Sequence, residues 1–338
     1  MKDARRAIAI VLVMMILSFA VFSGCSPKVV EKKPAIKIAA IFIGVIEDAD
    51  WNALGYIGLQ EAGNAYNLET AYSQKVAVSD AEGAMREYIA AGYNVIFADS
   101  AEYAVPALKI ADEFPNVTFI AYAEGQPVDP KPNVWYIDRN YFTGAYVLGA
   151  LAALTTKTGK IGFIGALDLP FLRGQINAIK QALKDQNSKA QFSYVFVGDF
   201  DDPVKAKQAA QSFISKDTDV LINVVNLGIY GVFAAVKDAK FPVYVTAMYS
   251  DKSPSVPDNY LAADLFDLTP LLKTVVGEIV GGTKGGYILM KYGDGEARYI
   301  QLPIQNVSVE ISNKVKQIAE DVASGKIQVN GVLDKILP

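Results

Sequence analysis

The sequence predicts an α/β protein with two doubly wound, Rossmann-like lobes that face each other across a cleft. Three observations lead to this prediction. Short apolar segments rich in β-branched residues alternate with segments of helical pattern, which is typical of parallel sheets covered by helices. The alternation occurs twice, with a break near Arg139. The chain of 338 residues is also long enough for two domains.

The expected strands form two series along the chain. The first series lies at 36–43, 69–73, 95–98, 117–122 and 134–137, and the second at 160–165, 192–197, 220–225 and 243–247. Ser79 and Glu82 have the spacing of a capping box, and Asp202 before Pro203 is typical of a helix start. A further helix is expected at about 269–280. We expect residues 36–138 and about 250–285 in the first lobe, and about 139–249 and 286–338 in the second.

The first 24 residues have the pattern of a secretory signal peptide. Basic residues precede a mainly apolar segment at 7–20, which is shorter than the roughly 20 residues of a membrane-spanning helix. Small residues and then Cys25 follow, and this arrangement resembles the lipobox of bacterial lipoproteins. The resemblance implies cleavage before Cys25, a lipid on that cysteine, and a tether up to residue 35. The alternative is an ordinary secretory peptide with an incidental thiol.

The composition excludes several classes of function. The formal net charge is −4, and an acidic chain is a poor match for nucleic acid. The chain has no histidine and only one cysteine, so Ser-His-Asp, Cys-His and Cys/His zinc sites are impossible. Carboxylate chemistry and an oxygen-ligand cation site remain open. Asp199, Asp201 and Asp202 lack the spacing of a calcium loop, and Asp202 is better interpreted as a helix cap. No metal site, cofactor or catalytic residue is assigned from these patterns.

The loops that follow the expected strands are where ligands bind in parallel α/β sheets. Two segments in and near these loops read Glu-Asp-Ala-Asp-Trp-Asn at 47–52 and Ala-Gly-Tyr-Asn-Val-Ile-Phe at 91–97, and two more lie at 156–165 and 197–203. In this order they resemble the basic membrane protein family of bacterial lipoproteins. The resemblance extends from Lys37 to about Val329.

This resemblance implies a type I periplasmic-binding-protein fold, with two lobes joined by a hinge and a small ligand in the cleft between them. It also implies an extracytoplasmic, lipid-anchored monomer that delivers its ligand to the permease of an ABC transporter. A nucleoside-binding member and a ligand-sensing lipoprotein are alternatives within the same fold. A carboxylate-based nucleoside hydrolase is an alternative from another class.

The ligand expected from the resemblance is a purine. In nucleoside-binding members an aromatic residue of the first loop stacks on the base and is followed by Asn, as Trp51 is by Asn52. Other positions depart from that pattern. Tyr249 stands where a ribose-binding Asp is expected, the strand at 261–266 lacks the usual Lys, and Glu124 stands near a missing Asp. The loss of ribose-binding groups favours a nucleobase, such as adenine, over a nucleoside.

The candidate ligand-binding residues come from the loops at the strand ends. Polar members could equally be helix caps or solvated loop residues, and any one tyrosine could be structural. Arg139 is expected to bridge the lobes and not to contact ligand. The complete set is Asp48, Trp51, Asn52, Glu102, Tyr122, Glu124, Asn140, Tyr141, Asp168, Asn226, Tyr230 and Tyr249.

Overall fold

The structure, a computed structural model, describes residues 35–186, 188–293, 295 and 297–337. Its compact unit begins at Ile36. The predicted signal peptide, Cys25 and nearly all of the predicted tether lie outside the described residues. Within the part that is described, no helix combines the length and the apolar character needed to cross a membrane.

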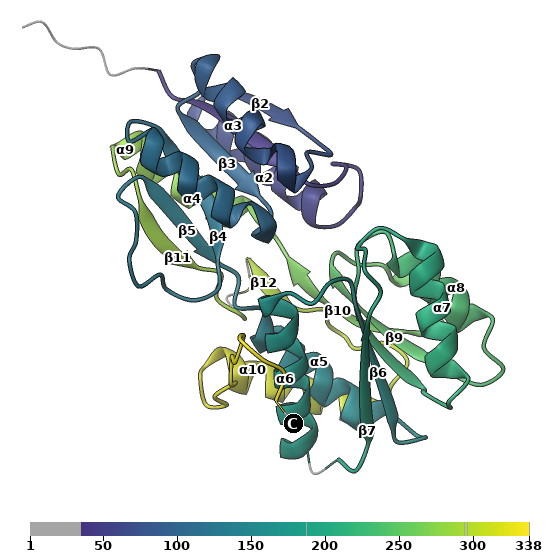
Figure 1. Ribbon diagram of the computed structural model, residues 1–338. Coiled ribbons are helices and arrows are strands. Elements are labelled where there is room, and N and C mark those ends of the chain that lie inside the picture. The colour runs from purple at the N-terminus through teal and green to yellow at the C-terminus, as the bar shows by residue number, and fades with distance from the viewer. Residues whose placement is uncertain (1–34, 187, 294, 296, 338) are drawn as a thin grey trace, which may run out of the picture. The chain divides into compact units, whose positions relative to one another are not determined.

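The first lobe is built on a six-stranded parallel sheet with the order β11-β5-β4-β3-β1-β2 (Figure 1). Buried parallel strands have two covered faces, which explains their nearly continuous apolar sequences. The strands are β1 (Lys37–Phe42), β2 (Glu69–Ser73), β3 (Val95–Asp99), β4 (Thr118–Ala123), β5 (Val134–Asp138) and β11 (Gly286–Leu289).

Helices cover both faces of this sheet. On β1, Ile38 and Phe42 point into the core shared with α2 (Trp51–Tyr66) and α9 (Thr269–Gly281). Ile41 belongs to a separate core with α3 (Ala81–Ala90) and α4 (Ala104–Glu113). The short helices η1 (Val78–Asp80) and η2 (Ala101–Tyr103) precede α3 and α4. Alternate strand residues therefore hold helices on opposite faces.

The second lobe has a similar six-stranded sheet, with the order β12-β10-β9-β8-β6-β7. Its ladders are parallel except for the one between β10 and β12, which is antiparallel. The strands are β6 (Lys160–Gly165), β7 (Gln191–Phe196), β8 (Val220–Val224), β9 (Tyr244–Tyr249), β10 (Tyr260–Phe266) and β12 (Arg298–Ile300).

The helices of the second lobe form two groups. Buried residues of α5 (Tyr141–Thr155), α6 (Pro170–Asp185) and α10 (Val309–Ala323) share one core with Ile222 of β8. Those of α7 (Pro203–Ile214) and α8 (Ile229–Lys237) share another with Leu221, the neighbouring residue. The short helix η3 (Ser253–Ser255) lies between β9 and β10.

The predicted strands agree closely with the structure, and the differences concern helix starts and lobe boundaries. Asp202 caps α7 as predicted, accepting hydrogen bonds from the backbone of Val204 and Lys205. The predicted Ser79 capping box is wrong, because no side chain caps α3 and the Ser79 hydroxyl bonds Asp80 instead. The structure also places β10 in the second sheet and β11 in the first, which differs from the expected division of 250–338.

The chain passes between the two sheets after β5, after β10 and after β11, and Arg298 joins these crossings. Its Nη1 donates to the carbonyl oxygens of Arg139 (2.8 Å) and Asn140 (2.6 Å), and its Nη2 to that of Tyr141 (2.9 Å). The same guanidinium contacts the carboxylate of Asp264, at 2.5–3.2 Å, and both side chains are fully buried. Arg298 therefore fixes the segment that carries Tyr141 into the cleft.

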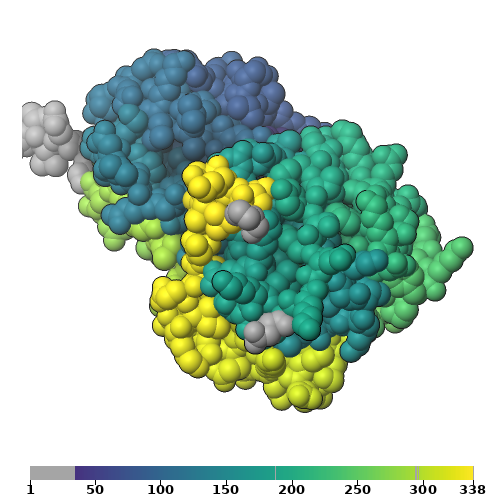
Figure 2. Space-filling view, turned by 60° about the horizontal axis from the view of Figure 1, so that its bottom comes forward, coloured from purple at the N-terminus to yellow at the C-terminus, as the bar shows by residue number. Residues whose placement is uncertain are grey.

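The end of the chain packs on the second lobe. The Asn177 amide donates to the carbonyl oxygens of Val332 (2.9 Å) and Lys335 (2.8 Å), and its oxygen accepts from the backbone of Leu337 (2.7 Å). Figure 2 shows yellow C-terminal residues lying against the teal residues of this lobe. These bonds hold the last described residues against α6.

Candidate ligand-binding site between the two lobes

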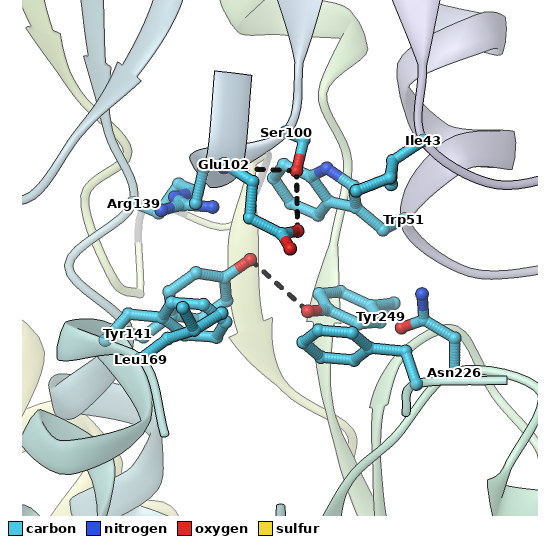
Figure 3. A pocket seen from close by; sticks show the side chains of 12 residues that line it. Ile43, Trp51, Ser100, Glu102, Arg139, Tyr141, Leu169, Asn226 and Tyr249 are labelled. Atoms are coloured by element: carbon cyan, nitrogen blue, oxygen red, sulfur yellow. Dashed lines mark hydrogen bonds between the residues drawn. The ribbon is translucent and has the colours of Figure 1, made fainter. Parts of the chain in front are cut away.

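A pocket lies at the carboxyl ends of strands from both sheets, where parallel α/β folds bind ligands (Figure 3). Its volume is about 40 Å³, and residues of both lobes contribute to its walls. It is lined by Ile43, Trp51, Ser100, Ala101, Glu102, Arg139, Tyr141, Leu169, Phe171, Phe200, Asn226 and Tyr249.

Trp51 enters the pocket because a network of hydrogen bonds orders the loop before α2. The Asp48 carboxylate accepts from the backbone of Asp50 (2.9 Å), Asn52 (3.2 Å) and Ala53 (3.0 Å). The Asn52 amide donates to Asp48 (2.6 Å) and accepts from the backbone of Gly44 (2.9 Å). Asp48 and Asn52 are buried within the loop and do not line the pocket. In this structure they position the indole and do not form the pocket wall.

Trp51 is the centre of an aromatic group that joins the lobes. Its ring centroid lies 4.9 Å from that of Tyr122, 5.5 Å from Tyr249 and 6.2 Å from Tyr141. The hydroxyl groups of Tyr141 and Tyr249 are 3.3 Å apart. Tyr122 is buried behind the pocket, where its hydroxyl donates to Asp99 (2.6 Å). The predicted Trp51, Tyr141 and Tyr249 thus form walls, while Tyr122 supports the indole.

Tyr249 has an unusual backbone conformation. Its φ is +72°, in the left-handed region that bulky residues rarely adopt. Strain of this kind persists only where the surroundings enforce it, and it concentrates at functional sites. Here it accompanies a ring that is buried at the junction of the two lobes.

Arg139 also lines the pocket, so the prediction that it only bridges the lobes was incomplete. Its guanidinium lies 4.7 Å from the ring of Tyr122, 4.9 Å from Tyr141, 5.2 Å from Phe171 and 5.5 Å from Trp51. Its Nη2 donates to Glu124, and its buried Nε has no hydrogen-bond partner among the described residues. Burial alone would lower the pKa of Arg139, but Glu124 and the tyrosines outweigh burial and raise it. The site therefore contains a permanent cation within a cage of rings.

Glu102 and Asn226 supply the other polar groups of the pocket. Glu102 is half-buried, and one of its carboxylate oxygens accepts from the Ser100 hydroxyl (3.2 Å). Figure 3 shows this carboxylate directed toward the space between the rings. Burial raises the pKa of Glu102. Asn226 presents its amide from the second lobe, so acceptor and donor groups reach the pocket from both sides.

Besides Asp48, Asn52 and Tyr122, four more predicted residues lie outside the pocket wall. Glu124 pairs with Arg139 behind the wall, and Asn140 starts α5 in a left-handed conformation. Asp168 is exposed and pairs with Arg173 (2.6 Å), and Tyr230 is exposed on α8. Sequence reasoning missed six lining residues, although four of them lie in the segments that follow the expected strands 95–98 and 160–165. They are Ile43, Ser100, Ala101, Leu169, Phe171 and Phe200.

Two parallel-sheet lobes with several crossings and an aromatic pocket between them define the class of two-lobed solute-binding proteins. A family model described as ABC transporter substrate-binding protein PnrA-like (Bmp) matches residues 35–332, and the chain belongs to this family. Its members are extracytoplasmic substrate-binding components of transporters and not enzymes. This confirms the resemblance and excludes the hydrolase alternative.

Individual relatives differ in the ligand that their names carry. A purine-binding protein of Brucella abortus is 29% identical over 55% of this chain and 53% of its own length. The TsgA13 protein of Haloferax volcanii is 24% identical over 87% of this chain and 74% of its own, and is provisionally named as glucose-binding. A solute-binding protein structure from Conexibacter woesei, 23% identical, superposes with a TM-score of 0.68 and covers 89% of this chain and 100% of that one. This superposition confirms the type I fold.

Proposed function

We propose that this protein captures a purine in the pocket between its lobes, a nucleobase in preference to a nucleoside, and delivers it to an ABC permease. The observation that carries the proposal is the aromatic wall of Trp51, Tyr141 and Tyr249 around a cavity of about 40 Å³. Flat rings exclude water from a flat ligand without requiring one hydrogen-bond pattern. Because the cavity is smaller than a base, the lobes must part for a base or a nucleoside to enter, and the preference for a base rests on the polar groups of the pocket.

The polar groups of the pocket support a base as the ligand. Glu102 can accept from an exocyclic amine, and the Asn226 amide can pair with a base edge that offers a donor beside an acceptor. Arg139 can donate to a ring nitrogen or a carbonyl oxygen. These groups would satisfy the edge of a purine in a dry site, which binding requires.

The groups that would bind a ribose are engaged elsewhere or absent from the wall. Tyr249 occupies the position expected for a ribose-binding Asp. Asp264 of β10 is fully buried and bound to Arg298, so it is not available to a ligand. Among the described residues that line the pocket, Glu102 is the one carboxylate. The arrangement therefore favours the base over the nucleoside.

Calorimetric titration of the chain lacking residues 1–25 tests this proposal. Adenine, guanine and hypoxanthine are compared with adenosine, guanosine and glucose. We expect at least one base to bind more tightly than its nucleoside. Tighter binding of every nucleoside would contradict the preference for a base, and binding of glucose alone would replace the purine by a sugar.

Anchoring at Cys25 is a separate part of the proposal. Residues 1–24 would be removed and the cysteine would carry the lipid, holding a monomer at the membrane beside its permease. Labelling of cells with a radioactive fatty acid should mark the wild-type protein and not Cys25→Ser. Equal labelling of the two would contradict lipidation at this position.

A further inference from the structure

A buried ion pair joins the two lobes beside the pocket. Asp50 lies in the loop before α2 of the first lobe, and Lys252 follows β9 of the second. The Lys252 ammonium contacts the Asp50 carboxylate, and the side chains of Lys252 and Asp50 are 4% and 1% exposed, respectively. The pair is thus nearly as buried as the side chains of the hydrophobic cores, although it lies where the two lobes meet.

The pair is attached to the segments that carry the two facing rings. Asp50 immediately precedes Trp51. Lys252 also donates to the carbonyl oxygen of Met248 (3.1 Å) and to the hydroxyl of Ser250 (2.9 Å), the residues on either side of Tyr249. The Ser250 hydroxyl in turn donates to the carbonyl oxygen of Ala49 (2.7 Å). One ammonium therefore ties the turn at Tyr249 to the loop before Trp51.

These contacts account for two features of the pocket. They hold the turn in which Tyr249 keeps its left-handed backbone, with φ at +72°. They also lie next to the contact of the Trp51 and Tyr249 rings, whose centroids are 5.5 Å apart. A shift of this turn would move one aromatic wall relative to the other.

The charges around the pair give it a role that a neutral contact could not fill. Asp50 is close enough to Asp48 and to Asp201, on the facing loop of the second lobe, to be affected by both charges. Without Lys252, three carboxylates would oppose the approach of the lobes. A buried ion pair contributes little net stability, because desolvation offsets attraction, and its established use is to select one arrangement.

We propose that Asp50 and Lys252 are positioning residues, whose buried ion pair holds Trp51 and Tyr249 together across the lobes and so sets how long a ligand stays bound. The dependence on ligand rests on the proposed function. The effect on the turn at Tyr249 does not, and it is measurable in the unliganded protein.

Three variants of the full chain test the proposal: Asp50→Asn, Lys252→Met and the double variant. Ligand dissociation is followed by tryptophan fluorescence, with the base that binds best as the probe. Lys252→Met should release the base about tenfold faster, since it removes a charge-assisted hydrogen bond and leaves the Asp50 carboxylate buried without its partner. Asp50→Asn keeps a neutral group beside the ammonium and should change the release rate less. The double variant should recover the wild-type unfolding temperature, because it removes both buried charges. It should not recover the slow release of the base, because it lacks the contact between residues 50 and 252 that joins the lobes.

Lys207→Met is the matched control. It removes a lysine from an exposed ion pair with Asp238, whose side chains are 37% and 63% exposed, and its release rate should equal that of wild type. Wild-type release in the double variant would overturn the positioning role and leave only a charge effect. Wild-type release in Lys252→Met would overturn the proposal altogether.

Hydrogen exchange in the unliganded protein separates this inference from the proposed function. In all three variants, amides at 248–252 should exchange faster than in wild type, while those of α3, whose buried residues belong to a separate core from Tyr249, should not change. Unchanged exchange at 248–252 would overturn the positioning role even if bases bind. If no base binds to wild type, the purine proposal fails. The exchange measurement alone then decides whether Asp50 and Lys252 are positioning residues.

Discussion

Trp51 is the side chain on which ligand binding should depend most. Its indole is 6% exposed, lines the pocket and contacts rings of both lobes. Stacking of a base on an aromatic side chain contributes about 1–3 kcal/mol. We expect Trp51→Ala to weaken base binding by about that amount in a calorimetric titration.

Trp135→Phe is the control for this substitution. Trp135 is also buried, but it lies on β5 and donates to the carbonyl oxygen of Thr283 (3.3 Å), away from the pocket. Its replacement should leave the affinity unchanged. Wild-type affinity in Trp51→Ala would remove the indole from the site.

Glu102 should select ligands with hydrogen-bond donors. Its carboxylate can only accept while it is ionised, and Ser100 occupies one of its oxygens. Replacement by Gln converts one acceptor into a donor, so we expect affinity for an amine-bearing base to fall by about tenfold. Affinity for a purine ring without exocyclic groups should change less. A fall of equal size for both ligands would contradict the assigned contact.

At the scale of elements, the hinge depends on Arg298. This fully buried side chain joins β12 to Asp264 of β10 and to the carbonyl oxygens at the start of α5. Removing one member of a buried ion pair costs about 3–5 kcal/mol. Denaturant unfolding of Arg298→Met should therefore show a loss of that size.

Two further variants serve as comparisons for the loss of stability expected in Arg298→Met. Gly144→Ala should also destabilise the protein, because a Cβ there would collide with the Asp264 carboxylate. Arg173→Met, which removes a partly exposed ion pair with Asp168, should cost less than about 1 kcal/mol. A loss for Arg298→Met as small as that for Arg173→Met would contradict the role of Arg298.

The sequence could predict individual strands, but not which sheet each strand joins. Strands such as 160–165 were predictable because both faces are covered and every position after Lys160 is apolar or small. The sheet that β10 or β11 joins was not, since alternation of strands and helices carries no information about pairing after a crossing. Trp51 and Tyr249 were expected from the family resemblance and Glu102 from its place in a loop after a strand, and all three line the pocket. Arg139 was underestimated, because sequence does not reveal that its guanidinium turns back among the rings.

At the scale of the whole molecule, closure of the lobes should be linked to protons through Asp50. Burial raises the pKa of its carboxyl from 3.8 to about 7, against the opposing effect of Lys252, and Asp48 and Asp201 raise it further. If the lobes part, Asp50 is exposed to water and returns toward the ordinary value. With the lobes joined, as in this structure, the Asp50 carboxyl then keeps a proton at pH values where it has lost that proton with the lobes parted.

Because the joined state binds more protons between about pH 4 and pH 7, it is favoured at the acidic end of that range. Ligand binding that requires closure should therefore take up protons there, weaken as the pH rises toward 7 and level off above it. Titration calorimetry in two buffers of different ionisation enthalpy measures this uptake. Asp50→Asn should reduce the uptake relative to wild type, and equal uptake in the two proteins would show that closure does not bury this carboxylate.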